Sequence, residues 1–174
     1  LAKDAETLYV TTGHGEMYWK LPKDADPARK ISFLKKGLRS ANFQVKELSL
    51  TNGLGSEIPE DARAVLILAP QSNFLDSEIE SLVNYWRGGG DLFVALEPDG
   101  ADLSPLLKEL GVAYELGASL AHANYFEPIG RKPVPSDQRN LVTNKFSTHA
   151  SITSLSRNNK IMKLTFSGAG ALSA

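Results

Sequence analysis

Two residues of one short loop, His14 and Glu16, are the strongest candidates for chemistry in this sequence. They follow an apolar run that ends at Thr11, and Gly13 and Gly15 on either side of His14 would let a ligand approach the backbone. An imidazole and a carboxylate can supply a general base or two metal ligands. The favoured interpretation is a tight turn whose polar side chains cap neighbouring loops, because no third catalytic partner stands beside the pair.

The loops that follow the predicted strands are the places where a ligand would bind. In open parallel sheets, ligands bind beyond the carboxyl ends of the strands, which here fall after Thr11, Ala69 and Leu96. A small ligand or a carbohydrate would meet the His14 loop at that edge. The candidate ligand-binding residues are Thr12, Gly13, His14, Glu16 and Gln71, and no residue is assigned to catalysis or to a metal.

Several catalytic classes are excluded by missing residues and motifs. The sequence has no cysteine, which excludes thiolate catalysis, iron–sulfur clusters and cysteine-ligated zinc. It also lacks a His-Glu-x-x-His zinc motif and a Walker-type phosphate loop. Its two Gly-x-Gly loops place Tyr18 and Ile58 where a dinucleotide-binding loop needs its third glycine, and Ala121 replaces the last glycine of a possible nucleophile elbow. We therefore expect a protein that is not an enzyme and uses no cofactor.

Strands and helices alternate through the first two thirds of the chain. The connections are short, which predicts an α/β fold of three layers with a mainly parallel sheet flanked by helices. Ala64–Ala69 is continuously apolar, as a strand covered on both faces should be. The other expected strands are 8–11, 43–48, 92–96 and 112–114, and the expected helices run from Asp26-Pro27 to about 41, from an N-cap at Asp76 to Gly88–Gly90, and from Ser104 to Gly111.

Length and charge describe one globular domain, residues 1–174, with regular βα units over 6–116 and a less regular part over 117–174. The chain has 174 residues, 42% of them hydrophobic, and a formal net charge of −1. Such a charge does not attract the phosphate backbone of nucleic acids, so nucleic-acid binding is not expected. The less regular part holds a proline-rich surface excursion, 127–140, and one clear strand, 161–166. Because the sequence begins at Leu1 and ends in small residues, we expect an excised piece of a longer protein.

Basic and aromatic residues near the first loop have simple structural interpretations. The run Arg29-Lys30, Lys35-Lys36 and Arg39 is expected to be the solvated face of the first helix. Tyr18-Trp19 and Tyr125-Phe126 could form contact patches, but loop anchors are the favoured interpretation for both pairs.

Several short motifs follow one another along the chain. They are 11–16 (Thr-Thr-Gly-His-Gly-Glu), 58–62 (Ile-Pro-Glu-Asp-Ala) leading into 65–70, Leu75 with Glu78, Tyr85 with 88–90, 96–98 (Leu-Glu-Pro) and 149–153 (His-Ala-Ser-Ile-Thr). Their order resembles that of the GldG-type auxiliary component of ABC transport systems, a family associated with gliding motility. The resemblance covers roughly the whole chain. Glu97-Pro98 stands where Asp-Pro is more usual, and Ala150-Ser151 replaces a proline after His149.

The resemblance implies a fold and a setting for the chain. The fold would be similar to the class I glutamine amidotransferase-like and flavodoxin-like folds, with a related domain in an intraflagellar transport protein. The implied role is a non-enzymatic auxiliary domain on the extracytoplasmic, periplasmic face of the bacterial cytoplasmic membrane. It would contact an ABC permease or other membrane subunits, be anchored by flanking spans and bind no nucleic acid. A ligand-binding or hydrolytic domain centred on His14 and Glu16 remains the alternative.

Overall fold

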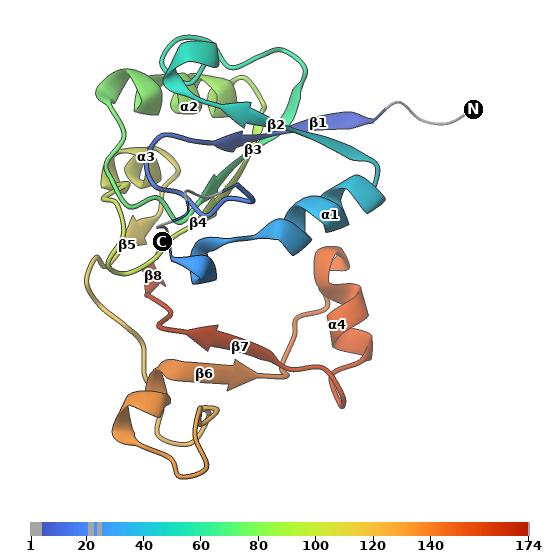
Figure 1. The fold of residues 1–174 in the computed structure, drawn as a ribbon, viewed down its shortest axis with the longest axis vertical. Helices are drawn as coiled ribbons and strands as arrows, with labels where there is room; N and C mark the ends of the chain where they lie inside the picture. Colours follow the sequence, from blue (N-terminus) through green and yellow to red (C-terminus); the bar gives the residue numbers. More distant parts are fainter. Residues whose placement is uncertain (1–4, 21–22, 24–25, 174) are drawn as a thin grey trace. The chain divides into compact units, whose positions relative to one another are not determined.

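The four main strands form one parallel sheet with the order β2-β1-β3-β4. The computed structural model describes residues 5–20, 23 and 26–173 (Figure 1). The central strand β1 pairs with both β2 and β3, and Leu8 lies opposite Val45 on one side and Ala64 on the other. The predicted α/β class with a mainly parallel sheet is therefore confirmed. The strand bounds are β1 Glu6–Thr11, β2 Phe43–Leu48, β3 Ala62–Leu68 and β4 Asp91–Ala95.

Alternating side chains of the strands build a separate apolar core on each face of this sheet. Val10 and Leu68 face one side, where they pack with the buried rings of Tyr18 and Trp19 and with the apolar face of α1 (Ser32–Ser40). The favoured interpretation of these two aromatic residues as loop anchors is confirmed by their burial. On the other face, side chains of β1 and β3 pack against α2 (Asp76–Arg87) and α3 (Ser104–Glu109); this cluster includes Tyr9, Val65, Ile67, Leu82, Val83, Leu106 and Leu107.

The first helix is shorter than the sequence predicts. Asp26 does act as a cap, since its carboxylate accepts a hydrogen bond from the Ala28 amide, but it caps only the short 3₁₀ helix Pro27–Arg29. The chain then becomes extended because the Tyr18 amide donates to Arg29 O and the Ile31 amide donates to Tyr18 O. This pairing with the first loop takes the backbone out of the helical conformation, so α1 starts at Ser32.

Helix α2 begins and ends close to the predicted positions. Leu75 rather than Asp76 is the N-cap, and the side chain of Glu78 accepts a hydrogen bond from its amide. The helix stops at the three glycines, and Gly89 has a φ of 94°, in the region that favours glycine. The remaining elements of the regular part are the 3₁₀ helix Leu50–Asn52 and the short strand β5 Ala113–Tyr114.

The chain divides into two compact units, which we call unit 1 (Leu1–Tyr114 with Ser173–Ala174) and unit 2 (Glu115–Leu172). The boundary after Tyr114 lies close to position 116, where the regular βα pattern of the sequence ends. A single domain over 1–174 stays a prediction. No helix in the described part of either unit is long and apolar enough to cross a bilayer.

Unit 2 is organised around a two-stranded antiparallel sheet, in which Leu141 of β6 lies opposite Phe166 of β7. The predicted strand 161–166 begins later than expected. The amides of Ile161 and Met162 both donate to Asn158 O, so this segment is a turn. The elements of unit 2 are the 3₁₀ helices Pro135–Arg139 and Ala150–Ile152, β6 Asn140–Thr143, α4 Thr153–Arg157 and β7 Leu164–Ser167. The division between the units falls within the final strand, β8 Leu172–Ser173.

Replacing Gly90 with alanine should destabilise the fold. A Cβ atom at this position would overlap the ring of Tyr85, whose hydroxyl donates to Ala62 O at the start of β3. We expect Gly90→Ala to lower the free energy of unfolding by about 1–3 kcal/mol in urea titrations. Gly37→Ala is the control, because its Cβ meets nothing within 4 Å in the interior of α1, and it should raise stability by up to about 1 kcal/mol. The opposite ranking would contradict the packing of Tyr85.

Asp61 should make stability depend on pH in acid. Its carboxylate accepts hydrogen bonds from Lys46 Nζ (2.6 Å) and Tyr9 Oη (2.8 Å), which hold the Asp61 pKa below its ordinary value of 3.8. A depressed folded-state pKa adds stability above pH 3.8, and that stability is lost as the pH falls through the folded-state value. Asp61→Asn should therefore flatten the fall in urea midpoint below pH 4.

The matched variant for this test is Lys46→Met. It removes the largest cause of the Asp61 shift and keeps the carboxyl group, so the acid part of the stability profile should flatten in the same way. A profile that stays as steep as that of the unmodified chain would contradict the role of this contact.

Candidate functional site

The loop after β1 turns back sharply and lies across the ends of the neighbouring strands. Gly13 and Gly15 have φ values of 121° and 70°, and a Cβ on Gly15 would stand 3.1 Å from the Cβ of Gln71. The Met17 amide then donates to Leu68 O at the end of β3 (2.8 Å). Glycine is therefore required at position 15 both by its backbone conformation and by the close approach of the loop after β3.

His14 lies between two carboxylates and is itself almost buried. Its Nε2 atom is 3.0 Å from Glu78 Oε2, and its Nδ1 atom is 3.4 Å from Glu16 Oε1. The second oxygen of Glu16 accepts a hydrogen bond from the His14 amide (2.8 Å). Glu78 is the third partner that the sequence alone does not reveal, and it comes from the first turn of α2.

The same contacts join the loop after β1 to the loop after β3. The His14 ring stacks on Phe74, with centroids 4.0 Å apart and an interplanar angle of 12°. His14 O accepts hydrogen bonds from the amides of Gln71 (2.7 Å) and Ser72 (3.1 Å). The loops that follow β1 and β3 therefore lie together at this edge of the sheet.

Glu78 is a charged side chain with only 1% of its surface exposed, and each of its contacts offsets the cost of burying that charge. Its Oε2 atom accepts from the Leu75 amide (2.8 Å) and faces His14 Nε2. Its place in the first turn of α2 adds the favourable field of the helix N-terminus. Glu78 therefore starts the helix and holds the His14 loop with one oxygen atom.

Arg29 makes a second cluster at the same edge of the sheet. Its guanidinium donates to Glu97 Oε2 (2.8 Å), to Gly15 O (2.9 Å) and to Ala69 O. Gln71 Nε2 donates to the same oxygen of Glu97 (2.8 Å). Arg29 therefore does not belong to the solvated face of the first helix, and the sequence interpretation is wrong for this residue because the extended segment after it turns the guanidinium toward the strand ends.

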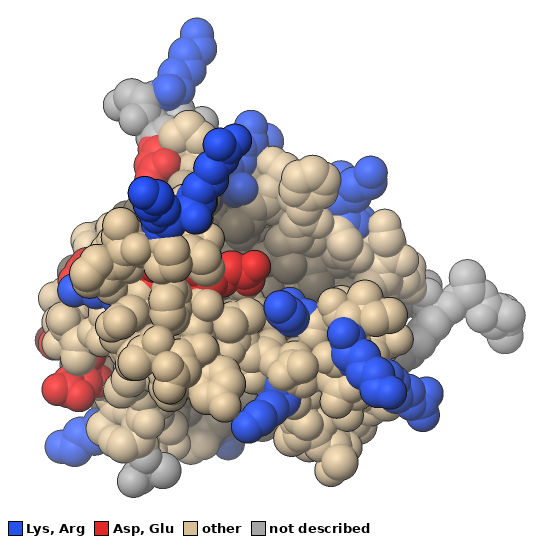
Figure 2. All heavy atoms as spheres, turned by 90° about the horizontal axis from the view of Figure 1, so that it is seen from below, with Lys and Arg blue, Asp and Glu red and all other residues tan. Residues whose placement is uncertain are grey.

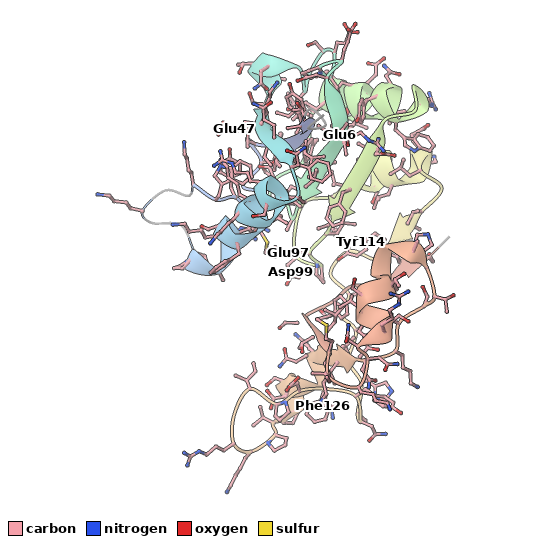
Figure 3. All side chains as sticks on the ribbon, turned by 90° about the vertical axis from the view of Figure 1, so that its right-hand side faces the viewer. Glu6, Glu47, Glu97, Asp99, Tyr114 and Phe126 are labelled. Atoms are coloured by element: carbon pink, nitrogen blue, oxygen red, sulfur yellow. The ribbon has the colours of Figure 1, made fainter. Side chains whose placement is uncertain are left out.

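Glu97 and Asp99, from the loop after β4, lie near the Tyr114 hydroxyl group (Figure 3). Burial raises the pKa of Tyr114, and the charges of Asp99 and Glu97 raise it further. The Tyr114 hydroxyl has no hydrogen-bond partner among the described residues. The three loops singled out by the sequence thus meet at one edge of the sheet and bring several acidic groups together.

The five predicted site residues have different positions in the structure. His14 and Glu16 face each other, and Gln71 joins them through its backbone while its side chain binds Glu97. Gly13 is exposed in the turn. Thr12 is not part of this cluster, because both its amide and its hydroxyl are directed to Leu48 O at the end of β2 (2.9 and 3.5 Å).

The arrangement is better suited to holding loops than to binding an ion. The two ring nitrogens of His14 point in divergent directions and each already faces its own carboxylate, so Glu16 and Glu78 do not converge on a common point with the ring. Over the described ranges, no group of three His, Asp or Glu side chains could hold a metal ion.

A groove of about 680 Å³ lies at the opposite edge of the sheet, away from the predicted site. It is lined by the segment that leads into β3, including Ile58 and Ala62, and by the end of α2, including Tyr85 and Gly90. These segments precede β3 and β4, so in a parallel sheet they mark the amino ends of the strands. None of the five predicted site residues lines this groove.

Comparison with known proteins shows a shared α/β fold and identifies no family. No protein-family model and no curated protein matches the sequence. Among solved structures, the mmIFT52 N-terminal domain is similar, with a TM-score of 0.65 over 95% of this chain and 67% of that one. The two sequences are 17% identical, so the likeness shows a shared α/β fold alone.

Removal of the Glu78 carboxylate should be among the most damaging changes in unit 1. Glu78→Ala leaves His14 Nε2 and the Leu75 amide without their acceptor, and we expect a loss of about 3–5 kcal/mol in the free energy of unfolding. Glu78→Gln retains an acceptor oxygen and should lose less.

The control for this prediction is Glu80→Ala on the same helix. Glu80 is exposed, so its replacement should change stability by no more than about 0.5 kcal/mol in the same urea titrations. Equal effects of Glu78→Ala and Glu80→Ala would show that the buried carboxylate does not hold the two loops.

Proposed function

We propose that this chain is a non-catalytic interaction domain. The observation that carries the proposal is the state of the strand-end edge, where an enzyme of this architecture would present its reactive groups. His14 is held by Glu78 and Glu16, and Arg29 is held by Glu97 and by backbone oxygens. Side chains that could act in catalysis thus hold the loops to each other. We therefore assign the function to the outer surface of the domain.

The narrower proposal is an auxiliary domain of an ABC-type transport system on the extracytoplasmic face of the membrane. It is supported by the resemblance to the GldG-type component. The residues that carry this resemblance make structural contacts in this fold. The Gly13–Glu16 motif forms the fastened loop, Asp61 joins β1 and β2 through hydrogen bonds, and Gly88–Gly90 ends α2. The partner would be a permease or another membrane subunit, reached through membrane anchors in flanking sequence.

We further propose that unit 1 shares the class I glutamine amidotransferase-like, flavodoxin-like fold. The strand order β2-β1-β3-β4 supports this, because it reverses direction between β1 and β3 as such folds do. The likeness to the mmIFT52 N-terminal domain adds support, since the resemblance implies a related domain in an intraflagellar transport protein. Without cysteine, the scaffold lacks the thiolate of cysteine-dependent amidotransferases.

The alternative function is recognition of a small ligand or carbohydrate at the His14 loop. Three buried polar atoms favour it, because His14 Nδ1, Glu16 Oε1 and Thr11 Oγ1 have no hydrogen-bond partner among the described residues. A ligand that supplied donors and acceptors to these atoms would gain from satisfying them. Opening the contact of 3.4 Å between the His14 ring and Glu16 would be needed first.

Affinity capture separates the two functions. The 174-residue chain, immobilised and exposed to a detergent extract of membranes from its own organism, should retain an ABC permease subunit, identified by mass spectrometry. An immobilised α/β domain of similar size and charge is the control. Failure to enrich any transporter subunit over this control would count against the transport role.

The ligand alternative is tested by thermal shift with a panel of saccharides and divalent cations. We expect no ligand of the panel to raise the melting temperature. A rise that His14→Ala abolishes would instead support the alternative, since a ligand that binds only the folded chain stabilises it by mass action.

A further inference from the structure

The two units differ strongly in formal charge, although the chain as a whole is nearly neutral. Unit 2, Glu115–Leu172, contains seven Lys and Arg and three Asp and Glu, a formal charge of +4. The chain has 19 basic and 20 acidic residues, so the remaining residues contain 12 and 17, a formal charge of −5. Together these give the net charge of −1. Unit 2 is therefore a basic unit attached to an acidic one.

The two units also differ in the ion pairing of their basic side chains. Among the described residues of unit 1, four basic residues form ion pairs with carboxylates: Arg29, Lys46, Arg63 and Arg87. Among the described residues of the chain, no carboxylate forms an ion pair with any of the seven basic side chains of unit 2. One of its three acids, Asp137, is buried and accepts a hydrogen bond from the Val134 amide (2.9 Å). The positive charge of unit 2 is thus available to a partner.

Unit 2 also exposes its apolar side chains. Within its described part, no hydrophobic residue is buried, and all four residues of β7 are exposed. Monomeric soluble proteins rarely leave large apolar side chains grouped at the surface without a binding role. The large exposed hydrophobic residues of unit 2 are Leu116, Leu120, Tyr125, Ile129, Val134, Ile161, Met162, Leu164, Phe166 and Leu172.

The two properties coincide in the segment 157–163, which we call the basic turn. Ile161, which is 85% exposed, and Met162 stand between Lys160 and Lys163, and Arg157 ends the preceding helix. The turn protrudes between α4 and β7 in Figure 1. It is held by hydrogen bonds from the amides of residues 161 and 162 to Asn158 O. Its apolar tip is therefore fixed in place with basic side chains on both sides.

We propose that unit 2 binds the surface of a bilayer containing anionic lipids, with the basic turn as its contact. Lys160, Lys163 and Arg157 would lie among the lipid phosphates, and Ile161 and Met162 would enter the boundary between headgroups and acyl chains. Basic residues beside exposed apolar ones are the composition of segments that lie on membranes.

A bilayer fits these observations better than an acidic protein does. Lysine is depleted in protein–protein interfaces, whose apolar cores need a shape-matched patch. A single protruding isoleucine flanked by lysines presents no such patch, whereas a fluid lipid surface adapts to it. Figure 2 shows Lys and Arg side chains of the chain at several separate places on the face that it draws. The proposal is independent of the transport role.

The test is co-sedimentation of the 174-residue chain with lipid vesicles. The chain should pellet with vesicles of mixed phosphatidylcholine and phosphatidylglycerol and stay in solution with phosphatidylcholine alone. Binding should weaken as salt rises from about 0.1 M to about 0.5 M, because salt screens exposed charges. Equal binding to both kinds of vesicle would overturn the proposal.

Matched variants locate the contact. The double variant Lys160→Glu, Lys163→Glu should weaken binding by about thirtyfold or more, and Ile161→Ser by about tenfold. Lys30→Glu, Lys36→Glu makes the same change of net charge at exposed positions of unit 1, and it should change binding by less than about twofold. Circular dichroism checks that each variant keeps its secondary structure.

Three further results would overturn the proposal. The first is undiminished vesicle binding by the Lys160→Glu, Lys163→Glu variant. The second is an equal loss in the control from unit 1, which would assign the effect to net charge rather than to the basic turn. The third is binding to polyglutamate without binding to vesicles, which would identify an acidic protein as the partner.

Discussion

The buried carboxylate of Glu78 is the constraint on which the strand-end edge of unit 1 depends. A charge with 1% exposure needs compensation, and here it comes from one backbone amide, one imidazole and the field at the start of α2. These partners belong to different segments. The start of the helix, the position of the His14 ring and the approach of the Phe74 loop are therefore fixed together, and the glycine at position 15 is required because the loops are so close.

This constraint gives a structural task to groups that look catalytic in the sequence, and it is the basis of the binding role that we propose. In the sequence, His14 and Glu16 have the types and spacing of an acid–base pair. In the structure, they and Arg29 close the edge of the sheet by fastening loops to one another. These contacts connect the loops after β1, β3 and β4 to one another. One fold can carry many unrelated functions, so the likeness to the mmIFT52 N-terminal domain does not by itself indicate a role for this chain.

The sequence predicts the sheet well because its signals are local. Apolar runs, an amphipathic helix and the three glycines after Arg87 determine β1, β3, β4 and α2 without reference to distant residues. Glu78 is missed as a site residue because its partner His14 is 64 positions away, although its place one turn before Leu82 on the apolar face of α2 is a visible signal. Arg29 is misassigned because the pairing of Tyr18 with the segment after it is not local. The charge division between the units is visible in the sequence only once the boundary is known.

The central position of β1 has a consequence for the order in which the sheet assembles. β1 is the first of the four strands along the chain, yet it pairs on both edges, with β2 and with β3, whose residues follow roughly 40 and 60 positions later. During synthesis on a ribosome, β1 emerges before β2 and β3. Until both have been synthesised, the unpaired edges of β1 can pair with the wrong segment. The topology thus pairs strands that are distant in the sequence. A chaperone would therefore matter for the nascent chain rather than for the folded domain.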